Sequence, residues 1–92
     1  MLKVVLSNLF KRDLKRAARR GRDVTLLEEI VNILAEKRSL PKANRDHSLS
    51  GKWIGYRECH IQPDWLLIYQ VNEDELFLLL MRTGTHSDLF GS

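Results

Sequence analysis

The chain has 92 residues, enough for one small domain, and its 43% hydrophobic and 29% charged residues are proportions typical of soluble globular proteins. A single cysteine, Cys59, excludes an internal disulfide and a cysteine-based metal motif. We find no apolar run long enough for a signal peptide or for the roughly 20 residues of a membrane span. We therefore expect a cytoplasmic protein without a membrane partner, folded as one domain over residues 1–92.

Positive charge is concentrated at the N-terminal end. The net charge is +3, yet residues 1–22 carry eight Lys or Arg against one acid, Asp13, while the rest of the chain has seven basic and eleven acidic residues. Such an asymmetry suggests a polyanionic or acidic partner. A solvated helix face would show the same charge density, so the charge alone does not choose between them.

The first predicted elements are a strand and a helix. The segment Leu2–Leu6 is short, apolar and β-branched, which indicates a strand, and Ser7 is a suitable N-cap for the helix that follows. Gly21 ends this helix. Its apolar stripe consists of Leu6, Phe10, Leu14, Ala17 and Ala18. Its remaining surface is cationic, with Lys11, Arg12, Lys15, Arg16, Arg19 and Arg20.

A second helix follows after a short turn. Thr25 and Glu28 have the spacing of a capping box, and Pro41 lies beyond the end of the helix. The apolar stripe consists of Leu27, Ile30, Val31 and Leu34. Only Arg22 and Asp23 separate the two helices, so we expect an antiparallel hairpin.

The C-terminal half has the period of strands. The polar segment Lys42–Gly51 is expected to be a loop, and the strands predicted after it are Trp53–His60, Trp65–Val71 and Leu76–Arg82. Short links between consecutive strands imply an antiparallel meander. The order β-α-α-β-β-β predicts an α+β domain with a helical hairpin packed on a small sheet.

A meander would bring several polar residues to one edge of the sheet. The strand ending at His60 and the strand beginning near Asp64 meet at the same end, and the last strand returns there to finish at Arg82. The segment Thr83–Phe90 can then fold His86 onto the group. Each residue also has a simpler role, as a surface side chain, a turn residue or half of an ion pair. Their coincidence at one edge is what favours a functional site.

The chemistry of this set is that of a metal-free ribonuclease. Two imidazoles with pKa values of about 6.5 can serve as acid and base near neutrality, and an arginine binds phosphate with a planar fork of donors. One group removes the proton of a ribose 2′-OH, which attacks the adjacent phosphate, and another protonates the departing 5′ oxygen. We expect His86 to be the acid and His60 or Asp64 the base, without a cofactor. A three-His-plus-Asp metal site remains an alternative, although no H-x-x-H or H-x-x-x-H pair supports it.

The segment DHSLSGKWIGYRECHIQPDWLLIYQV and the later segment RTGTHSDLF resemble the YafQ branch of the RelE/ParE toxin superfamily. The resemblance is close over Asp46–Phe90 and looser in the N-terminal half. It implies a ribosome-dependent endoribonuclease that cuts messenger RNA, and a cognate antitoxin that inhibits it. The matching functional positions are His47, His60, Asp64, Arg82, His86 and Phe90. His47 rests on the resemblance alone, because the predicted strand puts it at the far end from His60.

Two other functions remain open on the same scaffold. Relatives in the wider superfamily poison DNA gyrase without cutting RNA, and a plain RNA-binding module would also explain the basic helix. The set of histidines and a carboxylate favours the nuclease. In that case we expect the six cations of the first helix to bind ribosomal RNA, and an acidic antitoxin segment to cover the basic surface or the catalytic edge.

Overall fold

The computed structural model describes residues 1–91, so the last residue of the predicted domain lies outside the description. The order of elements is β1 (Lys3–Leu6), α1 (Asn8–Arg19), α2 (Val24–Ala35), η1 (Lys42–Asn44), β2 (His47–Ser48), η2 (Gly51–Trp53), β3 (Arg57–Gln62), β4 (Trp65–Asn72), β5 (Phe77–Gly84) and α3 (His86–Phe90). The predicted α+β order is confirmed, with β2 and α3 added. None of the helices in residues 1–91 is long and apolar enough to cross a membrane.

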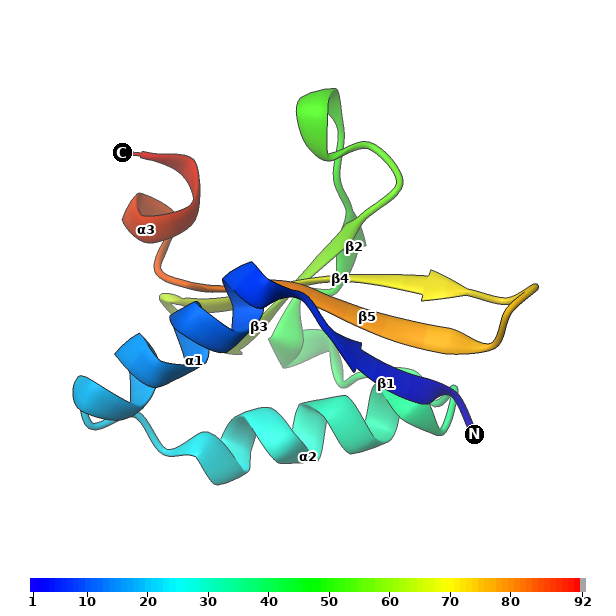
Figure 1. The fold of residues 1–92 in the computed structure, drawn as a ribbon, viewed down its shortest axis with the longest axis horizontal. Helices are drawn as coiled ribbons and strands as arrows, with labels where there is room; N and C mark the ends of the chain where they lie inside the picture. The colour runs from blue at the N-terminus through cyan, green and yellow to red at the C-terminus, as the bar shows by residue number, and fades with distance from the viewer. Residues whose placement is uncertain (92) are drawn as a thin grey trace.

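The sheet has five strands in the order β1-β5-β4-β3-β2. The predicted antiparallel meander is present, since β3 pairs with β4 and β4 with β5, while β1 joins β5 in parallel. Figure 1 shows α1 and α2 below the sheet, and α3 and the segment between β2 and β3 standing above it. The upper face of the sheet is therefore bordered by α3 and by the segment between β2 and β3.

Helix α1 begins where the sequence predicts. The Ser7 hydroxyl accepts a hydrogen bond from the Phe10 N–H at 2.9 Å and donates to the Met81 carbonyl at 2.7 Å, which ties the cap to β5. The predicted apolar stripe is wrong at three positions. Leu6 belongs to β1 and is exposed, and Ala18 is exposed as well. Asp13 is buried in the stripe, because its carboxylate accepts hydrogen bonds from the end of β5.

Helix α2 begins earlier than predicted. Its N-cap is Asp23, whose side chain accepts a hydrogen bond from the Thr25 N–H at 3.0 Å, so the predicted capping box of Thr25 and Glu28 is wrong. Aspartate is at least as good an N-cap as threonine, and it occurs first along the chain. The helix buries Leu27, Ile30, Leu34 and Ala35.

The strand after the loop begins later than predicted, at Arg57 and not at Trp53. Gly51 and Gly55 have φ angles of 66° and 91°, which take the backbone out of the extended region and leave Trp53 in the short turn η2. The predicted loop also contains β2, which pairs with β3. The C-terminal strand β5 runs to Gly84, two residues past the predicted end at Arg82.

Strand β4 lies in the middle of the sheet and is buried on both faces. Trp65, Leu67 and Tyr69 belong to the core between the sheet and the helices α1 and α2. Leu66 and Ile68 alternate with them and form a smaller cluster with Leu89 of α3 on the opposite face. The apolar contact of Leu89 is thus one of the interactions that hold α3 over the sheet.

Candidate active site

Two histidines far apart in sequence lie side by side. The rings of His60, on β3, and His86, at the start of α3, have centroids 5.8 Å apart. Strand register explains the approach, because His60 pairs with Leu66, and Leu66 pairs with Gly84 just before α3. The predicted convergence of these histidines is present, on the upper face of the sheet.

Asp64 fixes His86 from the turn between β3 and β4. Its Oδ1 accepts a hydrogen bond from the His86 backbone N–H at 3.1 Å and lies 3.1 Å from the ring Nδ1. The backbone hydrogen bond, and then the contact with the ring, lower the pKa of Asp64 below its usual value. Asp64 is therefore an ionised acceptor that orients the His86 ring through its Nδ1.

Glu58 lies between two histidines and was not among the predicted residues. Its Oε1 is 3.6 Å from Nε2 of His47 and 3.7 Å from Nε2 of His60, and only 5% of its side chain is exposed. The available sequence signal was its i, i+2 spacing from His60, which puts both side chains on one face of a strand.

The structure corrects the expected position of His47. It is not at the far end from His60: in β2 it pairs with Glu58, two residues from His60 along β3. Its Nδ1 lies 2.7 Å from the Arg45 carbonyl, which fixes the ring. The segment between β2 and β3 folds back on itself through η2, and this reversal returns His47 to the other histidines.

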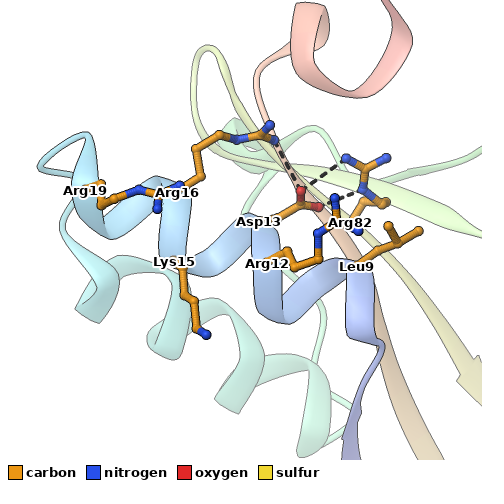
Figure 2. A pocket seen from close by; sticks show the side chains of 7 residues that line it. All are labelled: Leu9, Arg12, Asp13, Lys15, Arg16, Arg19 and Arg82. Carbon is orange, nitrogen blue, oxygen red and sulfur yellow. Dashed lines mark hydrogen bonds and ion pairs between the residues drawn. The ribbon is translucent and has the colours of Figure 1, made fainter.

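The sequence predicted a free Arg82 at the edge of the sheet, but in the structure its guanidinium is paired. Its Nε and Nη2 donate hydrogen bonds of 2.7 and 3.1 Å to the Asp13 carboxylate of α1 (Figure 2). The Thr83 N–H donates to the same carboxylate at 3.1 Å. The hydrogen bonds that Arg82 donates to Asp13 raise the pKa of the guanidinium. Across β4, Arg82 pairs with Ile68, which pairs with Glu58, so its side chain begins on the same face as the histidines.

Asp13 is a second residue that the sequence analysis did not select. It is the one acid of the N-terminal basic segment, and its spacing of three and four residues from Phe10 and Ala17 puts it on the buried stripe. An acid on the buried side of a basic helix indicates a buried cationic partner, and that partner is Arg82.

The six cations of α1 divide into two groups. Arg16 and Arg20 form ion pairs with Asp88 of α3, at 3.7 and 2.7 Å, and Arg16 also pairs with Asp13 at 3.2 Å. Within residues 1–91 the other four make no ion pair, and these are Lys11, Arg12, Lys15 and Arg19. A cavity of about 300 Å³ connects this surface to Arg82 (Figure 2), and its lining consists of Leu9, Arg12, Asp13, Lys15, Arg16, Arg19 and Arg82.

The C-terminal segment forms a helix, α3, which the sequence did not predict. Thr85 and Asp88 form a capping box around its first turn. Leu89 is buried, whereas the Phe90 side chain is 41% exposed and its ring centroid is 6.2 Å from that of His86. Phe90 is thus placed to offer an aromatic face beside the histidine.

Three of these groups could also hold a metal ion. Ligand atoms of Glu58, His60 and His86 all lie within 4.8 Å of one another. Two imidazole nitrogens and one carboxylate oxygen suit zinc, copper or nickel. The thiol of Cys59 is no part of the set, since it is fully buried and its burial raises the pKa to about 12.

Residues 2–91 match the family model of a bacterial toxin of type II toxin–antitoxin systems, YafQ. This defines the class of protein as the toxin component of a toxin–antitoxin pair. The chain belongs to the YafQ toxin family, which confirms the resemblance drawn from the sequence.

Three relatives illustrate the similarity. The mRNA interferase toxin YafQ of Escherichia coli K12 is 40% identical over 86 residues, covering 92% of this chain and 91% of its own. A metal-bound toxin from Helicobacter pylori is 42% identical with a TM-score of 0.93, over 98% of this chain and 100% of that one. YafQ in the E. coli DinJ–YafQ complex is 37% identical with a TM-score of 0.89, over 99% and 100% of the two chains.

Proposed function

We propose that this protein is a ribosome-dependent endoribonuclease that cleaves messenger RNA without a metal, by attack of the ribose 2′-OH on the adjacent phosphate. The observation that carries the proposal is the pair His60 and His86, with ring centroids 5.8 Å apart and with Asp64 orienting His86. The similarity to a toxin named an mRNA interferase supports the same reaction.

The contacts of each ring assign its role. The Asp64 carboxylate accepts from Nδ1–H of His86 and so orients the ring, and we assign Nε2–H of His86 as the acid for the departing 5′ oxygen. The Nδ1 of His60 lies 3.1 Å from the Pro63 carbonyl, and because a carbonyl only accepts, Nδ1 carries the proton. The free Nε2 of His60 is then the base that takes the 2′-OH proton.

Two other groups stabilise charge during the reaction. Glu58 lies 3.7 Å from Nε2 of His60 and becomes the counterion of the imidazolium when the ring gains a proton. The guanidinium of Arg82 neutralises charge that develops on the phosphate. Asp64, which the sequence left as a possible base, is assigned to His86 as an orienting group.

The cavity and the four unpaired cations of α1 supply affinity for the ribosome. Lys11, Arg12, Lys15 and Arg19 form an exposed basic surface along one helix without an aromatic side chain among them. Such a surface binds phosphates independently of sequence. We assign it to ribosomal RNA, while the site above the sheet takes the messenger RNA.

A cognate antitoxin completes the system. A toxin of the same family is found in complex with the DinJ antitoxin. The basic surface of α1 favours an acidic antitoxin segment, which would block ribosome binding by covering it. Co-expression with a neighbouring small open reading frame that encodes the antitoxin should restore growth to cells that express this protein.

A metal ion at Glu58, His60 and His86 would act as an inhibitor and not as a cofactor. The Helicobacter pylori relative is metal-bound, and in this chain two imidazoles and a carboxylate come close enough to hold an ion. An ion held by both rings would occupy the nitrogens assigned to the base and the acid. The reaction proposed above needs these nitrogens free.

Mapping of RNA ends in cells that express the protein tests the proposal against inhibition of DNA gyrase. New 5′ ends within open reading frames are the expected result, since the acid–base set has no use in a gyrase poison. Trapped gyrase–DNA complexes without new RNA ends would overturn the proposal.

A further inference from the structure

We propose that Asp88, held by Arg20 and Arg16 of α1, is a positioning residue for the acid His86. This inference rests on the proposed function, because it assigns a role in the same proton transfer. It also moves Arg16 and Arg20 from the predicted RNA-binding set to the support of the active site.

The ion pair of Arg20 and Asp88 joins the C-terminal end of α1 to α3. The Arg20 guanidinium donates from Nη1 to Oδ2 of Asp88 at 2.7 Å and from Nη2 to Oδ1 at 3.3 Å, a forked geometry that fixes direction as well as distance. Nη2 of Arg16 approaches the same Oδ2 to 3.7 Å. The Asp88 side chain is 13% exposed and that of Arg20 is 46% exposed, so the carboxylate, though not the guanidinium, is shielded from solvent.

The same carboxylate shapes the first turn of α3. Oδ2 of Asp88 accepts from the Thr85 N–H at 2.9 Å, and the Asp88 N–H donates to the Thr85 hydroxyl at 3.0 Å. His86 lies inside this closed turn, directly after Thr85. A Cβ atom placed on Gly84 would come within 2.9 Å of the Asp88 Cβ, which shows how closely the turn packs on the end of β5.

His86 needs such support because its own contacts are exposed. The His86 side chain is 51% exposed and that of Asp64 is 63% exposed. Exposed ion pairs contribute little to the stability of a fold. A helix of five residues is also too short to be stable alone. The position of the His86 ring relative to His60 therefore depends on the contacts of Asp88 and Leu89.

Single-turnover cleavage with two leaving groups separates positioning from the other roles of these residues. One message carries the normal 5′ oxygen at the cut site, and the other carries sulfur, which departs without protonation. We expect Asp88→Asn and Arg20→Gln to slow cleavage of the normal message by about 10- to 100-fold, the effect of misplacing a catalytic group by an ångström. The sulfur message should be cut at nearly the wild-type rate by both variants.

Arg19→Gln is the matched control. It removes the same charge from the neighbouring position of α1, and Arg19 makes no ion pair among residues 1–91. Arg19→Gln should weaken ribosome binding and therefore slow cleavage of both messages equally. Equal slowing of both messages by Asp88→Asn or Arg20→Gln, or wild-type cleavage of the normal message by Asp88→Asn, would overturn the positioning role.

Backbone dynamics give a second test that does not depend on activity. Backbone ¹⁵N order parameters of His86 and Leu89 should fall from about 0.85 to below about 0.6 in Asp88→Asn, and should fall less in Arg20→Gln, which keeps the capping box. Unchanged order in both variants would contradict the inference. His86→Ala tests the catalytic role of His86 separately from the positioning role of Asp88. If this variant cuts the normal message at the wild-type rate, the proposed function fails whatever the effect of Asp88→Asn.

Discussion

The carboxylate of Asp13 accepts two hydrogen bonds, of 2.7 and 3.1 Å, from the guanidinium of Arg82. The arginine assigned to the phosphate is thus held in place by an acid from α1, with 19% of its side chain exposed and 6% of that of Asp13. Removing the cationic partner of a buried carboxylate lowers the stability of the fold, and so does removing the carboxylate partner of a buried cation.

A double-mutant cycle measures this coupling. Asp13→Ala should reduce the free energy of unfolding by about 2–3 kcal/mol, because it leaves the Arg82 charge and the Thr83 N–H without their acceptor. The Asp13→Ala, Arg82→Met double variant should be more stable than the sum of the single losses predicts. Additive losses in chemical denaturation would show that the two side chains stabilise the fold independently.

The ion pair of Asp88 gives the stability a defined dependence on pH. The hydrogen bond from Arg20, the first of several causes, places the pKa of Asp88 well below the ordinary value of about 3.9. A carboxyl with a depressed pKa stabilises the folded state above its unfolded pKa, and this contribution is lost as the pH falls through the folded value.

The difference in unfolding free energy between the wild type and Asp88→Asn should therefore be constant from pH 7 to about pH 5 and shrink below about pH 4. Urea titrations at several pH values measure it. A difference that grows on acidification would contradict the assignment.

The basic surface of α1 can be tested by charge reversal. Arg12→Glu with Arg19→Glu should weaken ribosome binding for every message and reduce the salt dependence by about one slope unit per lost phosphate contact. The control is Lys3→Glu, since Lys3 lies on β1 opposite Phe77, at the other end of the strand from the helix. A changed cleavage sequence at unchanged affinity would refute the assignment of these cations to ribosomal RNA.

Sequence periodicity was sufficient for much of the fold. The change from a period of about four to a period of two separated the helices from the meander, and the meander brought the start of the segment that carries His86 beside His60. The elements that were missed have no periodic signal. Strand β2 has two residues, and α3 is a five-residue helix held by contacts with α1 and β4. Such elements exist because of the tertiary structure around them.

The residues of the site that strand register brings together, such as His60 and His86, could be predicted from the sequence. Asp13 and Glu58 have spacings that place them on the faces where they lie, but the role of a buried acid depends on its partner, which for Asp13 is 69 residues away in sequence. His47 was found by resemblance and misplaced by geometry, because the reversal through η2 depends on glycines with positive φ angles and leaves no pattern in the polar side chains.

Metal ions should inhibit the reaction. Cleavage should survive a chelator under conditions that keep ribosomes intact, and added zinc or copper should slow it, because the ion occupies His60 and His86. Glu58→Gln should reduce metal affinity by about 10- to 100-fold and so weaken the inhibition. Activity that requires added metal would contradict both the mechanism and the role given to this cluster.

The central claim is that His86 protonates the departing 5′ oxygen, and the most direct measurement is single-turnover cleavage by His86→Ala of messages with oxygen or sulfur at that position. On the oxygen message the rate should fall by roughly 10²–10⁴, the usual contribution of one positioned proton donor. The sulfur message should restore His86→Ala but leave His60→Ala slow, since a base is still required. Wild-type cleavage of the oxygen message by His86→Ala, or failure of sulfur to restore it, would contradict the account.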